Sequence, residues 1–384
     1  MSIDRLLASV RSLAPLVEAE RRSLDGEREL SPRLIEPLME AGLFRLWAPK
    51  ELGGAELDPI SGLRVIAAVS ALDGSVGWNV MISSAYSFFA GRLSARAAEQ
   101  IYGGRRAVVA GQLEPGGKAD MVVGGYRASG RWPFGSGCKQ ATWFLAQCVV
   151  HENGHARPGV AGRPEVRLVF VPADRCRIHD TWYVSGLRGT GSHDYSIEDV
   201  DVASEYSFDL FADEPTRQEP LYSFPVIPFV TSAVAAVPIG IARAALGAFK
   251  GLAKTKRSFG SPQMLSEHPT TQRELGRAEL HLRSAEGLLF QAVDAMWETV
   301  KAGKPPTLEQ RAEVRMGCVN AGVSAAEAVD IVYNLGGSGS IFEKNLLERC
   351  FRDVHVATQH VAVAPKTLEV VGRVFLGMEP QGLI

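Results

Sequence analysis

The spacing of apolar residues changes twice along the chain, and these changes limit its fold more than any other feature. Over residues 1–105 the apolar residues recur at helical intervals. Residues 106–215 are instead short apolar runs divided by Gly, Pro, Asn and Asp, a pattern typical of strands in a sandwich or barrel. Over residues 225–384 the helical spacing returns. We therefore expect an α+β protein with an N-terminal helical domain, a middle β-sandwich or barrel domain and a C-terminal helical domain.

The C-terminal part of the chain predicts a four-helix bundle. Its long apolar-periodic segments are separated by Pro305-Pro306 and by a glycine cluster that starts at Gly336. These segments are 237–254, 270–302, 307–334 and 345–375. Long helices joined by short breaks favour an antiparallel bundle.

Two apolar segments are long enough to raise the question of a membrane or a subunit contact. The run from Pro225 to Leu246 approaches the length of a bilayer span. It also contains further prolines, a glycine and Arg243, so we interpret it as a buried helix and expect no membrane partner. The segment from Val76 to Leu93 is apolar nearly all round, which is typical of a helix in a large core or a subunit contact.

Charge and cysteine content exclude several classes of protein. The net charge is −2 and no basic block stands out, so we expect no nucleic-acid partner. Five cysteines without a C-x-x-C pair speak against a disulfide framework or a zinc site and fit a reducing compartment. The N-terminus lacks the apolar region of a signal peptide. We therefore expect a cytoplasmic protein.

The stretch from Gly130 to Trp143 is the strongest candidate for a ligand site. Glycines flank Ser136 on both sides, so the backbone there can bend tightly or approach a ligand closely. Trp132, Phe134 and Trp143 add three aromatic rings to the same short segment. A small hydroxyl among flat rings suits a flat heteroaromatic ligand such as a flavin. The alternative is a hairpin with an aromatic core, because aromatic residues in strands usually serve packing.

Other familiar sites are not supported by the spacing. His355 and His360 are five residues apart and do not share a helix face, so we expect no metal site. Glycines immediately beside Ser136 do not give the G-x-S-x-G spacing of a hydrolase elbow. Gly189-Thr-Gly191 lacks the third glycine and the following helix of a dinucleotide-binding turn.

Two further groups could carry chemistry. Lys254, Lys256 and Arg257 follow a long apolar segment, where they are either ordinary partners of the helix dipole or a phosphate clamp. Arg257 is the better clamp, because guanidinium matches phosphate geometry. His360 falls near the end of the last expected helix and is either a capped or buried histidine or a proton donor, proton acceptor or hydrogen-bond partner.

Taken together, several short motifs in the same order resemble the acyl-CoA dehydrogenase superfamily nearly from end to end. They are Gly42 to Gly54, Gly111 to Gly117, Gly130 to Trp143, Gly186 to Asp194, Arg257 to Gly260, and Leu335 to Gly339 followed by Arg349 and Arg352-Asp353. The resemblance implies the fold of that superfamily, with helical first and last domains and a β domain between them.

The resemblance also implies a flavin site. Phe134 stands where an aromatic ring stacks on the flavin, and Ser136 stands where a hydroxyl and a backbone N–H meet flavin N5. Arg257 belongs to a motif that reaches the flavin phosphate across a subunit contact, which implies a homotetramer. The cofactor-binding residues implied in this way are Phe134, Ser136, Arg257, Phe259, Gly336 and Gly337.

The chain departs from the dehydrogenases of this superfamily at their catalytic base. Many of them carry a glutamate just after the Arg-Asp motif, whereas Val361 occupies that position here and cannot remove a proton. His360, together with the Gly130–Trp143 stretch, is similar instead to the two-component flavin monooxygenases of this fold. The resemblance to this subgroup therefore implies a different reaction.

That reaction is oxygenation of an aromatic or heteroaromatic small molecule. The resemblance implies an oxygenase component that takes reduced, diffusible FMN or FAD from a separate NAD(P)H:flavin reductase, binds O2 and forms a C4a-hydroperoxyflavin that hydroxylates or epoxidises the substrate. Ser136 would hold flavin N5, and His360 would hydrogen-bond the peroxy group or supply its proton. Tyr86, Trp132 and Trp143 would line the substrate pocket. Tyr86 stands where phenol hydroxylases carry a histidine, which argues against a simple phenol.

Two other functions remain open on the sequence. The first is a flavin dehydrogenase or oxidase that acts on an acyl thioester or a nitroalkane, although Val361 argues against it. The second is a non-catalytic flavin-binding or assembly subunit.

Overall fold

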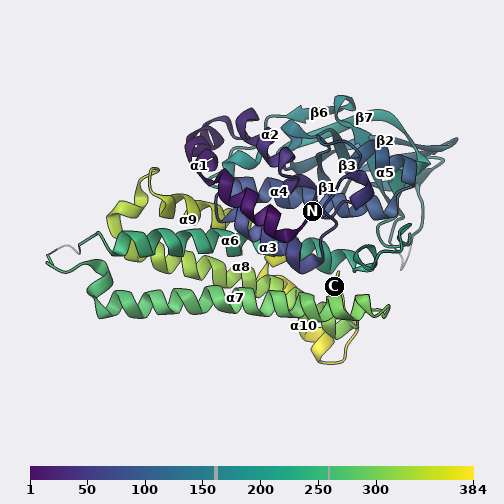
Figure 1. The fold of residues 1–384 in the computed structure, drawn as a ribbon. Helices are drawn as coiled ribbons and strands as arrows, with labels where there is room; N and C mark the ends of the chain where they lie inside the picture. Colours follow the sequence, from purple (N-terminus) through teal and green to yellow (C-terminus); the bar gives the residue numbers. More distant parts are fainter. Residues whose placement is uncertain (160–162, 258–259) are drawn as a thin grey trace.

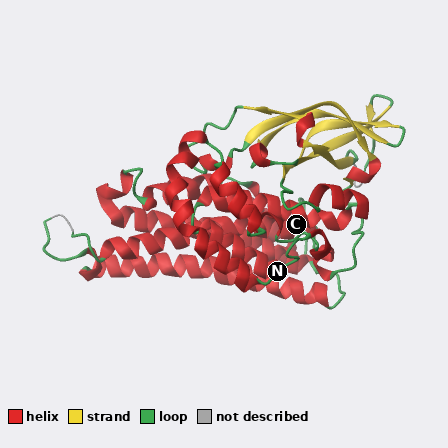
Figure 2. Cartoon of the chain, turned by 45° about the horizontal axis from the view of Figure 1, so that its top comes forward, coloured by secondary structure: helices red, strands yellow, loops and turns green. Residues whose placement is uncertain are grey.

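The computed structural model describes residues 1–159, 163–257 and 260–384. Phe259, one of the expected cofactor-binding residues, lies outside the described residues. The helices form the larger part of the molecule, and the strands gather in one sheet on one side of them (Figure 1, Figure 2).

The N-terminal domain is helical, and aspartates cap two of its helices. Its helices are α1 (Ile3–Glu27), α2 (Pro32–Glu40), α3 (Pro59–Ser70), α4 (Gly74–Ser87) and α5 (Ala95–Tyr102). The Asp58 carboxylate accepts from the Ser61 N–H at the start of α3, and the Asp73 carboxylate accepts from the Ser75 and Val76 N–H groups at the start of α4. These caps satisfy backbone donors that have no partner within the helix.

The middle domain is an eight-stranded mixed sheet with the order β6-β7-β2-β1-β3-β5-β8, and β4 pairs with β3 at its side. The strands are β1 (Val109–Val122), β2 (Gly125–Gly135), β3 (Trp143–Glu152), β4 (His155–Ala156), β5 (Val166–Pro172), β6 (Cys176–His179), β7 (His193–Ala203) and β8 (Ser207–Phe208). β1 pairs with β3 in parallel and with β2 in antiparallel orientation. The sheet packs a core of its own, separate from the main helical core.

The C-terminal domain is a bundle of long helices, but its last expected helix is broken. The helices are α6 (Val226–Ala253), α7 (Pro269–Lys301), α8 (Leu308–Gly336), α9 (Leu346–Ala357) and α10 (Leu368–Phe375). We expected one helix over 345–375, whereas α9 ends at Ala357 and two short 3-10 turns precede α10. Pro365 disfavours a helical conformation for the residue before it, which apolar spacing alone does not reveal. The break places His360 in a turn rather than near the end of a helix.

Helix α6 is apolar enough by length and composition to cross a membrane, but 83% of its most apolar window is buried inside the protein. It lies among the other helices in Figure 1 and packs against α3, α4, α8 and α9. An apolar helix that is covered by its own chain behaves as a core helix.

A buried ionic cluster joins the N-terminal domain to the bundle. The Nε of Arg349 on α9 lies 2.6 Å from Oδ2 of Asp73, whose side chain is fully buried, and 3.9 Å from Oδ2 of Asp353. The second carboxylate oxygen of Asp353 accepts from the Leu187 N–H at 2.6 Å. Burial raises the pKa of Asp353, and the positive charge of Arg349 acts against this rise. Two residues of α9 therefore hold other parts of the chain: Arg349 binds Asp73 at the start of α4, and Asp353 binds the loop at Leu187.

We predict that Arg349→Met destabilises the protein by about 3–5 kcal/mol, because it leaves buried carboxylates without their cation. The control is Arg127→Met, which removes an exposed ion pair with Asp201 and should change stability little. The measurement is the free energy of unfolding in urea at matched protein concentrations. Equal effects of the two variants would contradict the importance of the cluster.

Candidate functional site

A β-bulge at the end of β2 decides which way the aromatic side chains of this strand point. The pairing of β2 with β7 shifts between Trp132 and Gly135, and Phe134 has a positive φ of 59°. In a regular strand Phe134 would share a face with Trp132, because alternate side chains point the same way. Instead Trp132 is fully buried and Phe134 is 59% exposed. The bulge thus turns the Phe134 ring outward, where it meets Trp182 edge to face.

Ser136 follows this bulge and is held against Trp78 of α4. The indole Nε1 of Trp78 donates to Ser136 Oγ at 3.0 Å. The Ser136 backbone N–H donates to the Phe134 carbonyl at 2.8 Å. The sequence implied that both the hydroxyl and the backbone N–H of Ser136 meet a ligand, whereas in the structure that N–H is already used within the chain. The hydroxyl is the group left for a ligand.

His360 approaches the same indole from the C-terminal domain. Its ring centroid lies 5.7 Å from that of Trp78, in an edge-to-face arrangement. His360 caps the short turn Val361–Val363, where its Nδ1 accepts from the Ala362 N–H at 3.1 Å. A ring nitrogen that accepts carries no proton, so the neutral ring has its proton on Nε2. His360 is therefore a hydrogen-bond donor through Nε2–H.

Arg315 of α8 fixes the turn that carries His360. Its Nη1 donates to the Ala362 carbonyl at 3.1 Å and its Nη2 to the Val361 carbonyl at 3.4 Å. The Arg315 side chain is buried, and in the described part of the chain no carboxylate pairs with it. Burial first, and the charge of Arg315 second, lower the pKa of His360 to about 4. The imidazole is therefore neutral at pH 7.

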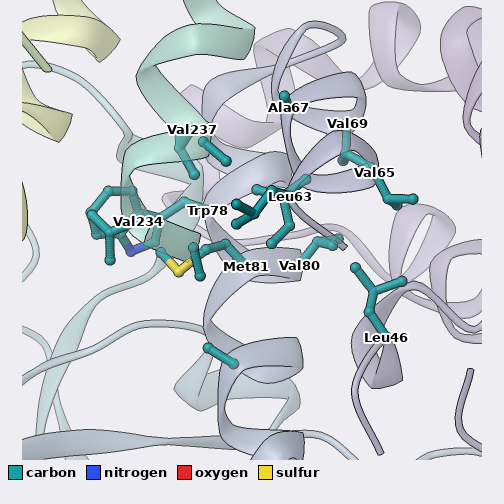
Figure 3. Packing of buried hydrophobic residues seen from close by; sticks show 14 of the residues in the cluster. Leu46, Leu63, Val65, Ala67, Val69, Trp78, Val80, Met81, Val234 and Val237 are labelled. Carbon is teal, nitrogen blue, oxygen red and sulfur yellow. The ribbon is translucent and has the colours of Figure 1, made fainter. Parts of the chain in front are cut away.

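Trp78 joins these groups within an apolar surrounding. It belongs to the same buried cluster as Met81 of α4 and Val234 of α6 (Figure 3). The Trp78 indole of the N-terminal domain contacts Ser136 of the β domain and His360 of the C-terminal domain, so all three domains meet at this side chain. Sequence reasoning did not include Trp78 or Arg315 among the site residues. For Trp78 the one available signal was its place in the nearly all-apolar segment from Val76 to Leu93, and for Arg315 the surrounding charged residues gave no such signal.

The residues that we expected to line a substrate pocket lie in packed positions. Trp132 is a core residue of the sheet, where it stacks on Tyr195 and donates to the Gln147 carbonyl, so the expectation of an aromatic core holds for Trp132 and a substrate contact does not. Trp143 is partly buried and stacks on Tyr206. Tyr86 is buried, donates to the Gly111 carbonyl at 3.1 Å, and has its pKa raised by burial.

The cationic segment after α6 lies far from the sheet. Both ribbon views place the loop after α6 at the end of the bundle that is remote from the strands (Figure 1, Figure 2). Arg257 is exposed, and the neighbouring Lys256 Nζ donates to the Gly336 carbonyl at 2.5 Å. Gly337 has a positive φ of 63°, and a Cβ there would come within 3.7 Å of Lys256 Nζ. The contact between Lys256 and Gly336 thus brings Arg257, the next residue, to the same end of the bundle as Gly336 and Gly337, away from the strands.

The groups around Ser136 fit a flavin better than a metal. The described side chains include no group of three or more His, Cys, Asp or Glu that could hold a metal ion. The Ser136 hydroxyl accepts one hydrogen bond from Trp78 and keeps a second lone pair, which is suited to an N–H of a ring system. The exposed Phe134 ring offers a flat apolar face two residues earlier. His360 adds a neutral hydrogen-bond donor. Together these three residues suit a flat cofactor with polar edges.

Comparison with known proteins identifies the family. Residues 5–94 match the model of the acyl-CoA dehydrogenase N-terminal domain, and residues 232–365 match the model of the acyl-CoA dehydrogenase C-terminal domain. The chain belongs to the acyl-CoA dehydrogenase superfamily. The expected fold class and family are thereby confirmed.

Individual relatives indicate to which branch of this superfamily the chain belongs. The indole-3-acetate monooxygenase of Pseudomonas putida is 32% identical over 99% of this chain and 94% of that protein. The flavin-dependent monooxygenase oxygenase subunit HsaA of Mycobacterium tuberculosis is 25% identical over 98% of this chain and 96% of that protein, and its crystal structure has a TM-score of 0.91 over 100% and 99% of the two chains. XiaF from Streptomyces sp., solved with FADH2 and glycerol, has a TM-score of 0.91 at 23% identity over 99% and 97% of the chains.

The chain is thus an oxidoreductase of the flavin-dependent monooxygenase branch, related over its whole described length to oxygenase components that use reduced flavin. This confirms the expected enzyme class and flavin cofactor.

We predict that the lowered pKa of His360 makes the protein less stable as pH falls. Above pH 6.5 the ring is neutral in both states. Below it the unfolded state gains a proton that the folded state does not take up until about pH 4, so stability is lost in between. Between pH 7 and pH 5 the free energy of unfolding of His360→Gln should therefore fall by about 1 to 2 kcal/mol less than that of the parent protein. Urea unfolding at both pH values measures this, and parallel pH profiles would contradict it.

Proposed function

We propose that the protein is the oxygenase component of a two-component system that oxygenates an aromatic or heteroaromatic small molecule. It takes reduced FMN or FAD from a separate NAD(P)H:flavin reductase, and O2 is its second substrate. The ring-containing substrates in the names of its relatives support an aromatic substrate class. Five free cysteines, four of them buried, support a location in the reducing cytoplasm.

One observation carries this proposal: Ser136 of the β domain and His360 of the bundle contact the same indole, that of Trp78. Reduced flavin bound at this point supplies the electrons that activate O2. The residues of the chain then have three tasks, which are to hold the flavin edge, to offer a hydrogen bond to reacting oxygen, and to exclude water. Ser136 performs the first task and His360 the second, and the cluster around Trp78, Met81 and Val234 performs the third.

His360 acts by donating a hydrogen bond rather than as a charged acid. The sequence left open whether it bonds the reacting oxygen or supplies its proton. A pKa of about 4 leaves almost no imidazolium at pH 7, whereas the Nε2–H of the neutral ring is always present. Arg315 keeps this tautomer in place through the Val361 and Ala362 carbonyls. A neutral donor stabilises partial negative charge without releasing a proton into the site.

The dehydrogenase alternative lacks a proton acceptor at the position where that chemistry needs one. Val361 is 54% exposed and apolar, and the cation beside it, Arg315, would oppose protonation of any base placed there. The residues of this turn therefore fit an oxygenase better than a dehydrogenase.

We further propose that the flavin phosphate is bound by Arg257 of a neighbouring subunit in a homotetramer. The position of the loop after α6 in both ribbon views supports this, because the loop lies at the end of the bundle that is remote from the strands (Figure 1, Figure 2). Exposed apolar side chains on the bundle, such as Leu280, Ile341 and Phe342, supply surface for such a contact. Trp143 and Tyr86 remain candidates for the substrate side of the site.

We predict that His360→Ala uncouples flavin oxidation from product formation. The fraction of oxidised flavin that yields product should fall about fivefold, with hydrogen peroxide released instead, because one hydrogen bond to reacting oxygen is lost. The assay supplies dithionite-reduced FMN and indole-3-acetate as the probe substrate and counts product and peroxide. His355→Ala removes a histidine that pairs with Asp330 and should leave coupling unchanged. Equal coupling in both variants would remove His360 from the reaction.

We predict that Arg257→Ala weakens reduced-flavin binding about tenfold, because it removes a charge-assisted hydrogen bond to phosphate. Lys254→Ala is the matched control, since this exposed cation also follows α6 and would serve the helix dipole equally well. Anaerobic fluorescence titration gives both dissociation constants, and native mass spectrometry gives the subunit number. A loss shared by both variants would favour the dipole interpretation over the clamp.

A further inference from the structure

A chain of buried hydroxyl groups runs from Ser136 into the loop between β6 and β7. Ser136 Oγ lies 2.7 Å from Ser192 Oγ, and Ser192 Oγ lies 2.7 Å from Thr190 Oγ1. Thr190 Oγ1 donates to the Leu187 carbonyl at 2.9 Å. All three hydroxyl-bearing residues are at most 5% exposed, so their hydrogen bonds are made within the protein.

The two ends of this chain fix the direction in which its protons point. At one end the Trp78 indole N–H can only donate, and at the other end the Leu187 carbonyl can only accept. Thr190 gives its proton to Leu187, so Ser192 must give its proton to Thr190. Ser136 must then give its own proton to Ser192. This is the one arrangement in which every hydroxyl proton has an acceptor.

Ser136 is left as an acceptor without a free proton. Its oxygen receives the Trp78 N–H and has one lone pair to spare. The nearby backbone donors are also engaged, because the Ser136 N–H donates to the Phe134 carbonyl and the Gly137 N–H to the Thr190 carbonyl. A ligand that approaches Ser136 Oγ is therefore met by an acceptor.

We propose that Ser192 and Thr190 are positioning residues that make the flavin site selective for the reduced state. The inference rests on the proposed placement of flavin N5 at Ser136. Reduced flavin carries a hydrogen on N5 and donates, whereas oxidised flavin has only a lone pair there and accepts. With its protons in this direction, the hydroxyl chain offers an acceptor to reduced flavin and no donor to oxidised flavin.

Oxidised flavin could be accommodated only by reversing the hydroxyl chain. Ser136 would turn its proton toward N5, Ser192 would donate to Ser136, and Thr190 would donate to Ser192. The Leu187 carbonyl would then lose the Thr190 hydroxyl, which at 2.9 Å is the shortest of its three donors among the described residues, and keep the Trp182 indole N–H and the Thr190 backbone N–H. The hydrogen bond from Ser136 to N5 is gained, and the bond from Thr190 to Leu187 is lost. The site therefore binds oxidised flavin about fivefold more weakly than a site with a free serine hydroxyl would. An oxygenase that receives reduced flavin and must release oxidised flavin benefits from this difference.

The test compares the dissociation constants of oxidised and reduced FMN, measured anaerobically by fluorescence titration and repeated with FAD. In Ser192→Ala the Ser136 proton has no internal acceptor and is free to meet oxidised N5. In Thr190→Val the hydroxyl that bonds Leu187 is already absent, so Ser136 can turn its proton toward N5 without the loss of that bond. Each variant should lower the ratio of the oxidised to the reduced dissociation constant about fivefold. Because both redox forms are measured on the same preparation, partial loss of folded protein does not alter the ratio.

Two controls separate this effect from general loss of a hydroxyl. Thr190→Ser keeps the chain intact and should keep the parent ratio. Ser207→Ala removes a buried hydroxyl in β8 that donates to the Ser204 carbonyl, and should also keep it. If Ser192→Ala and Thr190→Val change both dissociation constants by the same factor, the residues serve only local structure and the inference is wrong.

Ser136→Ala distinguishes failure of the inference from failure of the proposed site. It should weaken reduced-flavin binding severalfold, because the acceptor for N5–H is removed. An unchanged affinity would mean that flavin does not meet Ser136, and both proposals would fall. A weakened affinity in Ser136→Ala together with unaltered ratios in Ser192→Ala and Thr190→Val would overturn the hydroxyl-chain inference alone.

Discussion

The arrangement of the site depends on one buried cation, the guanidinium of Arg349. It neutralises Asp73, which caps α4, and Asp353, which holds the Leu187 N–H. A carboxylate inside a protein is tolerated only with such a partner. Through these two acids the cation sets the position of the helix that bears Trp78 and of the loop whose carbonyl ends the hydroxyl chain. Its influence therefore reaches Ser136 although the two residues do not touch.

Trp78 is the point at which the separate domains become one site. Helix α4 presents the indole, the bulged end of β2 presents Ser136 to its N–H, and the turn after α9 places the His360 ring in a T-shaped contact with it. None of the three elements could form this arrangement alone. The site is thus a property of domain packing, and it lies next to the apolar cluster in which α4 and α6 meet (Figure 3).

The polar groups around this indole share a common feature, which is that each has one fixed hydrogen-bonding role. Ser136 accepts, because its proton is committed to Ser192, and His360 donates, because its Nδ1 is committed to the Ala362 N–H. Burial, and after it the charge of Arg315, lower the pKa of His360 and keep the imidazole neutral. Groups that are fixed in this way need no reorganisation when a reaction develops charge beside them, which is the main source of electrostatic stabilisation in enzymes.

Local sequence was sufficient for the order of helices and strands, for the glycine-flanked serine, and for the missing carboxylate at Val361, because spacing and residue type act over a few positions. It could not separate Trp132 from Phe134, since the bulge that buries one ring and exposes the other depends on pairing with β7. Nor could it show the break after Ala357, the neutral state of His360 or the contact with Trp78. Those features arise from burial and from residues far apart in the chain, so only the tertiary structure decided them.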